Sequence, residues 1–212
     1  MAIRGTLIYL CSLAVLFPSA AQDETTTENC TTSHIQHPLT ELKEAAECLL
    51  PQWSTDQTAA LLYTMRTLGD MLHKHQLTAC QGAEPKKCPA AAVHSDGGLV
   101  CATVSSKRYC KPMCNDGYDF DFLRRSRLFD ECSESTGYTW RSQYIGGTKL
   151  AVCSESHVQI SGAQTAYFPK DQDCLRTKSS SDLHNSTIHN FITELKDQGI
   201  DGNPEYICLV CG

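Results

Sequence analysis

The chain of 212 residues lacks the motifs by which many enzymes and membrane proteins are recognised. It has no Gly-x-Ser-x-Gly elbow and no His-Glu-x-x-His motif, which are typical of serine hydrolases and zinc proteases. Beyond residue 21 no apolar run is long enough to span a bilayer, and the C-terminus has no hydrophobic tail for a lipid anchor. We therefore predict no catalytic residue and no membrane span. A catalytic triad assembled from separated residues stays open, because triads follow no fixed sequence order.

Basic residues are also in the minority, with 18 Lys and Arg against 24 Asp and Glu and a net charge of −6. Nucleic-acid-binding domains are usually basic, so a nucleic-acid partner is not expected. The eight histidines show no pair with the spacing of a zinc site beside free thiolates. The sequence accordingly predicts no metal site and no cofactor.

The first 21 residues have the three parts of a secretory signal peptide. A short start with Arg4 precedes an apolar run from Leu7 to Phe17, and Ser19 and Ala21 are the small residues before a cleavage site at Gln22. A membrane anchor is the alternative, but about 11 apolar residues are too few to cross a bilayer. We expect a secreted, extracellular protein.

Cysteine usage agrees with this address. Of the 13 cysteines, 12 remain after residues 1–21 are removed, an even number that predicts disulfides in an oxidising compartment. The predicted disulfide cysteines are Cys30, Cys48, Cys80, Cys88, Cys101, Cys110, Cys114, Cys132, Cys153, Cys174, Cys208 and Cys211. Asn29 and Asn185 each begin an Asn-x-Thr sequence, which is a site for N-linked glycosylation. The Cys-x-x-Cys pair at 208–211 resembles a redox motif, but no helix follows to activate a thiol, so we expect two structural bridges.

The predicted fold class is α+β, a small disulfide-rich β module flanked by an N-terminal helical pair and a C-terminal extension with one helix. Residues 22–37 are polar and predict a flexible lead. Residues 38–87 contain two helical patterns, over 38–50 and from Ser54 to about Leu77, and then a linker. Residues 88–153 form the cysteine-rich module. The extension, 154–212, holds an amphipathic helix that ends at Gly199 and a final apolar strand.

Within the module, the run from Leu99 to Val104 and the run that begins at Tyr109 predict a hairpin, with Cys101 and Cys110 on opposite arms. Further along, Cys114 is followed by Gly117 and Tyr118, and the chain continues through Cys132 and Trp140 to Cys153. This order resembles the sushi, or complement-control, module. The resemblance implies bridges Cys88–Cys132 and Cys114–Cys153, with Tyr118 and Trp140 packed between them. Two extra cysteines and the missing proline before Cys153 depart from the family pattern.

Parity makes a prediction about the six cysteines outside the module. Three precede it and three follow it, so with no free thiol at least one bridge must join the two flanks. Residues three apart on a strand face opposite ways, so we expect Cys208 and Cys211 to bond not to each other but to two partners, one N-terminal cysteine and Cys174. The apolar helix faces of the flanks are then expected to pack together; these faces are Leu61, Met65 and Leu68 on one helix and Ile188, Phe191 and Leu195 on the other.

One surface pattern suggests a binding site. Arg124, Arg125 and Arg127 place three guanidinium groups within four residues, which suits sulfate and carboxylate oxygens. Local ion pairing with flanking acids and proteolytic processing after Arg127 are the alternatives. We expect a monomeric interaction protein that binds an extracellular protein or a sulfated glycan. A secreted enzyme of unrecognised type and an extracellular matrix component stay open as alternatives.

Overall fold

A computed structural model describes residues 36–144 and 147–212, and the chain divides into two units, residues 1–54 and 55–212. In the first unit, α1 spans Gln36–Leu49 and is followed by a short 3-10 turn, η2, at Leu50–Gln52. The predicted helix over 38–50 is thus present and begins two residues earlier, within the predicted lead. Pro51 follows the helix because its ring does not fit a helix interior.

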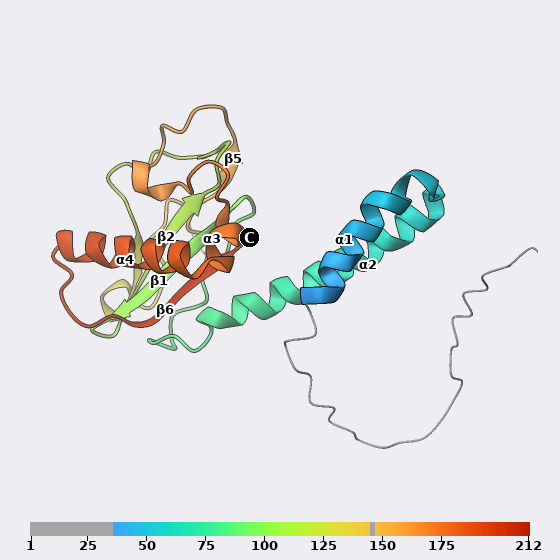
Figure 1. The fold of residues 1–212 in the computed structure, drawn as a ribbon. Helices are drawn as coiled ribbons and strands as arrows, with labels where there is room; N and C mark the ends of the chain where they lie inside the picture. The colour runs from blue at the N-terminus through green and yellow to red at the C-terminus, as the bar shows by residue number, and fades with distance from the viewer. Residues whose placement is uncertain (1–35, 145–146) are drawn as a thin grey trace, which may run out of the picture. The chain divides into compact units, whose positions relative to one another are not determined.

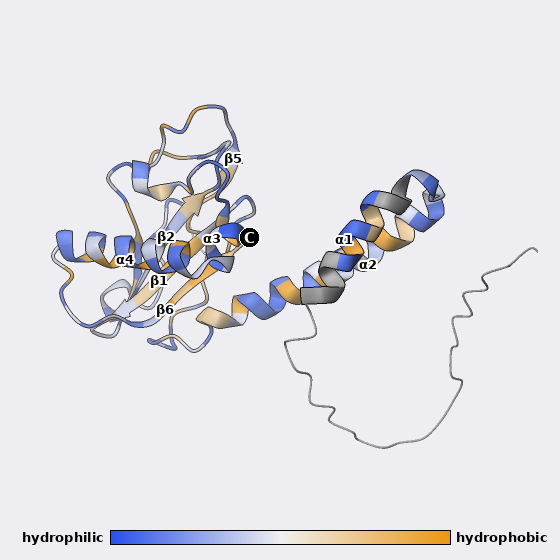
Figure 2. Ribbon diagram, in the orientation of Figure 1, coloured by the Kyte–Doolittle hydropathy of each residue, from blue (hydrophilic) through white to orange (hydrophobic). Residues whose placement is uncertain are grey.

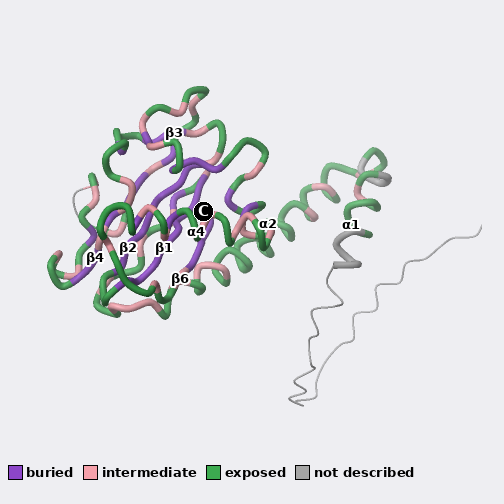
Figure 3. Tube along the Cα trace, turned by 60° about the vertical axis from the view of Figure 1, so that its left-hand side comes forward, coloured by how far each residue is buried: buried purple, intermediate pink, exposed green. Residues whose placement is uncertain are grey.

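The second unit begins with α2, Thr55–Leu77, which continues into η3, Thr78–Cys80. The capping pattern at Ser54 therefore marked the start of this helix correctly. Most of α2 is exposed (Figure 3), and Met65 and Leu68 keep 43% and 37% of their surface in solvent. The expected packing of this face against Phe191 is wrong, because Phe191 packs against the sheet instead.

The main sheet has four antiparallel strands in the order β4-β2-β1-β6, of which β2, β1 and β6 are labelled in Figure 1. Their bounds are β1 Gly97–Val104, β2 Lys107–Cys114, β4 Asp130–Cys132 and β6 Glu205–Cys211. β1 and β2 form the predicted hairpin, and Ser105 and Ser106 turn the chain with φ values of 49° and 60°. Two positive φ values in a two-residue loop match the twist of the flanking strands.

β6 comes from the predicted C-terminal extension, yet it pairs with the inner strand β1 and forms one edge of this sheet. Residues 88–153 therefore do not contain the whole sheet to which their strands belong. A second, two-stranded sheet joins β3, Tyr118–Phe120, to β5, Cys153–Glu155. Short 3-10 turns lie at η4, Glu134–Thr136, and η5, Gln164–Ala166.

One face of the main sheet is covered by α3, Cys174–Ser179, and α4, Ser181–Asp197. Phe191 and Leu195 of α4 are each 1% exposed and pack against Val100 and Leu209 of the strands. This arrangement follows from the helical spacing of the apolar residues in α4, and Gly199, with a φ of 76°, ends the segment. Figure 2 shows hydrophobic colours on β1 and β6 and largely hydrophilic ones on α4.

The opposite face of the sheet carries a second core. On this side Leu99, Cys101, Cys110 and Val210 belong to one buried cluster with Trp140. Residues of the segment 77–93 pack against the cluster; these are Leu77, Cys80, Cys88, Ala91 and Val93. Because both faces are covered, every residue of β1 is buried. Tyr118 belongs to a third cluster around Cys114–Cys153, so Tyr118 and Trp140 pack in separate clusters rather than in one.

Five disulfides connect described residues: Cys80–Cys208, Cys88–Cys132, Cys101–Cys110, Cys114–Cys153 and Cys174–Cys211. These pairs confirm the hairpin bridge, the two bridges implied by the resemblance, and the parity prediction for Cys208 and Cys211. Cys30 lies outside the described residues, and so does the side chain of Cys48. Among the helices that the structure describes, none has the length and apolar character that crossing a membrane requires.

Candidate functional site

A pocket of about 570 Å³ lies between the second face of the sheet and the segment 77–93. Its volume is within the range of ~300–1,000 Å³ that is usual for small-molecule sites. The sheet contributes Leu99 and Val210, and the covering segment contributes Leu77 and Val93. Trp140 closes one side. The pocket walls are therefore mainly apolar.

The walls are held by bonds between distant parts of the chain. The indole Nε1 of Trp140 donates a hydrogen bond of 2.8 Å to the carbonyl oxygen of Pro89, which fixes the ring against the covering segment. The same segment is tied to β6 by Cys80–Cys208 and to β4 by Cys88–Cys132. Residues 81–93 of this segment, which form no helix and only an isolated bridge at Ala92, are thus kept in place over the sheet.

Arg108, near the start of β2, is the cation among the buried residues that line the pocket. Only 4% of its surface is exposed. Its Nη1 donates to the carbonyl oxygen of Tyr206 at 2.6 Å and to Oγ1 of Thr103 at 3.3 Å, and Nη2 donates to Sγ of Cys208 at 3.0 Å. All three acceptors are neutral.

The Arg108 guanidinium has no ion-pair partner among residues 36–144 and 147–212. A guanidinium has five N–H donors, so Nε–H and one Nη2–H of Arg108 have no acceptor in the described part of the chain. Burial lowers the pKa of Arg108 to about 10, and the side chain is still charged at neutral pH. The pocket therefore contains a positive charge that no described carboxylate neutralises.

Two other buried cations show the usual arrangement. Nζ of Lys111 lies 2.6 Å from Oε2 of Glu194, and Nη2 of Arg124 lies 2.8 Å from Oδ2 of Asp130. Buried charges in proteins are normally paired in this way, because an isolated one loses its hydration without compensation. Arg108 departs from the rule, and it does so in a pocket.

Glu84 is the acidic residue of the pocket lining, but it does not neutralise Arg108. Its carboxylate accepts a hydrogen bond of 3.1 Å from the backbone N–H of Lys86 and lies 3.8 Å from the Lys86 ammonium group. Its side chain is 42% exposed. The backbone oxygen of Glu84 instead accepts from Oγ1 of Thr103 at 2.6 Å, which positions the hydroxyl that Arg108 contacts.

The three arginines that the sequence singled out lie elsewhere and are not equivalent. Arg124 is 3% exposed and its guanidinium bonds Asp130 and the carbonyl oxygen of Leu150, so it is not part of a surface site. Arg125 donates from Nε to the carbonyl oxygen of Ile160, and Arg127, 43% exposed, lies 3.8 Å from Asp130. Local ion pairing, one of the alternatives, accounts for Arg124.

The predicted glycosylation sites are placed in part. Asn185 is exposed on α4, and Asn29 lies outside the described residues. Attachment of sugar at either site stays a prediction.

Two groups of cysteine and histidine side chains have the closeness of metal ligands. They are Cys80, Cys101 and Cys208, and His94, Cys114 and Cys153, each group with its ligand atoms within 4.8 Å of one another. All of these sulfurs belong to disulfides, so none is a thiolate that could bind a metal. The first group borders the pocket and lies beside Arg108.

Sequence reasoning missed Arg108 and the pocket. The predicted hairpin places Arg108 in the turn between its two runs, but the residue lies in β2. Because side chains alternate between the two faces along a strand, Arg108 shares a face with Cys110. That alternation was the available signal.

No family model matches the chain, and comparisons with curated proteins and with solved structures find no match either.

Proposed function

We propose that this protein is a secreted binding protein whose pocket takes a small amphipathic anion. The apolar part of the ligand lies against Leu77, Val93 and Trp140, and its carboxylate or sulfate group accepts hydrogen bonds from Arg108. The observation that carries the proposal is the buried guanidinium, which has no carboxylate partner in the part of the chain that the structure describes.

Among the described residues, Arg108 lacks a compensating negative charge. A buried charge without a partner is penalised by several kcal/mol, and an anion at the two unoccupied N–H donors removes much of that penalty. Charge-assisted hydrogen bonds contribute roughly 1.5–3 kcal/mol each, more than neutral ones. An apolar wall alone would accept many ligands, whereas the buried cation selects those with an acidic end.

Two features support an extracellular address for this function. Five disulfides in residues 36–212 are typical of proteins that fold in an oxidising compartment. The N-terminal signal-peptide pattern is the second. The sushi resemblance stays a prediction about residues 88–153, supported by the bridges Cys88–Cys132 and Cys114–Cys153.

The proposal is tested by calorimetric titration of the oxidised protein with ligands that share a decyl chain and differ in the head group. Decanoate and decyl sulfate are expected to bind, decanol at least about tenfold more weakly, which corresponds to ~1.4 kcal/mol. Decyltrimethylammonium should not bind. Equal affinity for decanoate and decanol would show that Arg108 does not select the ligand.

Two variants sharpen the test. Arg108→Met keeps an unbranched apolar stem and removes the guanidinium group with its charge, so it should remove the preference for decanoate over decanol. Arg141→Met, which alters an exposed arginine outside the pocket lining, is the matched control and should bind as wild type does. The comparison of head groups on wild-type protein stands even if Arg108→Met folds poorly.

A second candidate function is contact with a sulfated glycan or an acidic protein surface through Arg125 and Arg127. It is favoured by the 43% exposure of the Arg127 side chain. In this second function the two guanidinium groups of Arg125 and Arg127 would form the contact, and the buried Arg124 would take no part in it.

A further inference from the structure

Three neighbouring strands of the main sheet each carry a cysteine at the same level. Cys101 of β1 lies opposite Cys110 of β2 and also opposite Cys208 of β6. Cys101 is bonded to Cys110, and Cys208 is bonded to Cys80 of η3. Two disulfides therefore lie side by side, and Cys101 has a second potential partner in Cys208.

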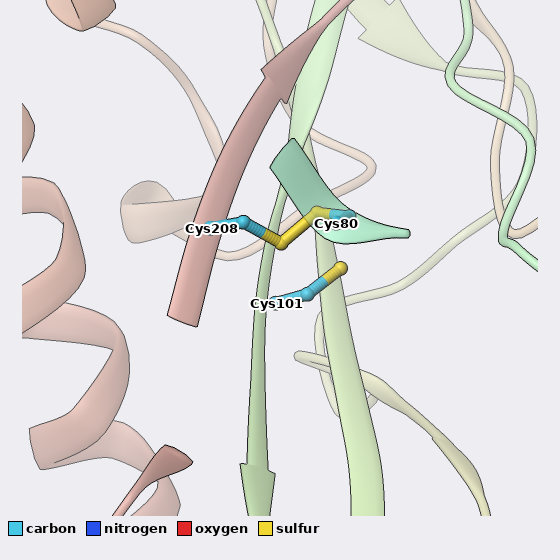
Figure 4. A group of neighbouring side chains, drawn as sticks. All are labelled: Cys80, Cys101 and Cys208. Atoms are coloured by element: carbon cyan, nitrogen blue, oxygen red, sulfur yellow. A yellow bond between two sulfur atoms is a disulfide. The ribbon is translucent and has the colours of Figure 1, made fainter. Parts of the chain in front are cut away.

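The sulfur atoms are close enough for exchange. Sγ atoms of Cys80, Cys101 and Cys208 all lie within 4.8 Å of one another, and Figure 4 shows the Cys101 side chain beside the Cys80–Cys208 bridge. Directly opposed residues on antiparallel strands have Cβ atoms about 4.5–5.5 Å apart, near the range that a disulfide spans. A Cys101–Cys208 bond thus requires little movement of the backbone.

The surroundings give the exchange a direction. Cys80 lines the pocket and is partly exposed, whereas Cys208 is 4% exposed and does not line the pocket. The Nη2 of Arg108 lies 3.0 Å from Sγ of Cys208. A guanidinium at this distance stabilises a thiolate, and a stabilised thiolate is the better leaving group. Attack from the pocket therefore occurs at Cys80 and releases Cys208.

We infer that Cys80–Cys208 and Cys101–Cys110 form a thiol-responsive exchange pair. A low-molecular-weight thiol attacks Sγ of Cys80 as its thiolate, forms a mixed disulfide there and breaks the bond to Cys208. The Cys208 thiolate then attacks Sγ of Cys101, which forms Cys101–Cys208 and breaks Cys101–Cys110. Cys110 leaves as a thiolate and takes up the proton that the external thiol lost. Two disulfide bonds exist before and after, and one external thiol is consumed.

The exchange changes what holds the pocket. Cys80 loses its bond to β6, so the stretch between Cys80 and Cys88 stays attached to the sheet through Cys88–Cys132. Regulation of ligand binding by this change rests on the proposed function of the pocket. The exchange chemistry itself does not, because it depends on the sulfur positions and Arg108 alone.

The test treats the folded, fully oxidised protein with isotope-labelled glutathione under nitrogen. Samples are quenched in acid, alkylated with N-ethylmaleimide in denaturant and mapped by mass spectrometry without reduction. We expect glutathione on Cys80, N-ethylmaleimide on Cys110 and a new peptide linking Cys101 to Cys208. Cys174–Cys211, a bridge on the far face of the sheet, is the internal control and should react more slowly.

Glutathione first at another bridge, or no reaction faster than that of the control, would overturn the inference. Alkylated Cys208 with an intact Cys101–Cys110 bond would overturn its second step. In the double variant Cys101→Ala/Cys110→Ala the second step has no target, so glutathione should still label Cys80 and N-ethylmaleimide should label Cys208. None of these results bears on the decanoate titration, which uses oxidised protein without thiol.

Discussion

The ammonium group of Lys111 lies 2.6 Å from Oε2 of Glu194, and the two side chains are only 2% and 14% exposed. The contact joins β2, an inner strand, to α4, the helix that covers its face. Burial is the largest influence on Lys111 and lowers its pKa, while the hydrogen bond to Glu194 and its negative charge act in the opposite direction. The pair is thus a fixed ionic contact between two layers of the fold.

Replacing Glu194 by Ala should lower the free energy of unfolding by roughly 3–5 kcal/mol, because it leaves a buried ammonium group uncompensated. Replacing both residues, as Lys111→Met with Glu194→Leu, should restore stability to near the wild-type value. Urea unfolding monitored by circular dichroism measures both. Lys107→Ala, which removes an ion pair that is 47% and 29% exposed, is the matched control and should change the value by less than ~1 kcal/mol. An unstable double variant would contradict this account.

Acid should destabilise the protein through His94. Burial lowers the pKa of this side chain from 6.5 to about 4. Between those values the unfolded chain binds a proton that the folded chain does not, so stability present above pH 6.5 is lost as the pH falls to 4. The loss attributable to His94 is roughly 3 kcal/mol.

Urea unfolding at pH 7 and at pH 4.5 provides the measurement. His94→Gln should reduce the difference between the two pH values, since glutamine does not titrate, while His157→Gln alters an exposed histidine and serves as control. An identical pH dependence in wild type and His94→Gln would show that His94 does not titrate as its burial requires.

We expect the exposed residues Arg125 and Arg127 to respond differently to substitution from the buried Arg124. Replacing Arg125 and Arg127 together by Ala should lower the salt needed to elute the protein from heparin, because screening governs exposed charges. Arg124→Ala should leave the elution unchanged and lower the free energy of unfolding by roughly 3–5 kcal/mol, because Asp130 then loses its partner inside the protein. The assignment fails if Arg124→Ala alone weakens retention and leaves stability intact.

Local patterns predicted the elements well, and the site poorly, for a physical reason. The amphipathic spacing in α4 and the paired runs of β1 and β2 are properties of short segments, so they can be read from neighbouring residues. Counting the cysteines required at least one bridge between the two flanks, and the opposite directions of Cys208 and Cys211 on a strand predicted two separate partners. The pocket instead combines Leu77, Arg108, Trp140 and Val210, which no short pattern connects, under residues 81–93, which form no helix.

The arginines illustrate the same limit. Arg124 and Arg125 are adjacent in a run of basic residues, yet one is buried against Asp130 and the other donates to Ile160 near the surface. The pattern of charges in the sequence shows which residues a loop contains, but it does not show where each side chain points. Arg108, which follows Ser105, Ser106 and Lys107 in the sequence, carried less sequence signal and has the more unusual environment.

The central claim is that Arg108 holds the anionic head group of a ligand in the pocket. Nuclear magnetic resonance of the arginine Nε–H groups during titration with decanoate tests this claim most directly. We expect one Nε–H signal, assigned to Arg108 by its absence in Arg108→Met, to shift with saturation while the signals of Arg125 and Arg141 stay in place. Saturable binding of decanoate that leaves the Arg108 signal unmoved would contradict the account.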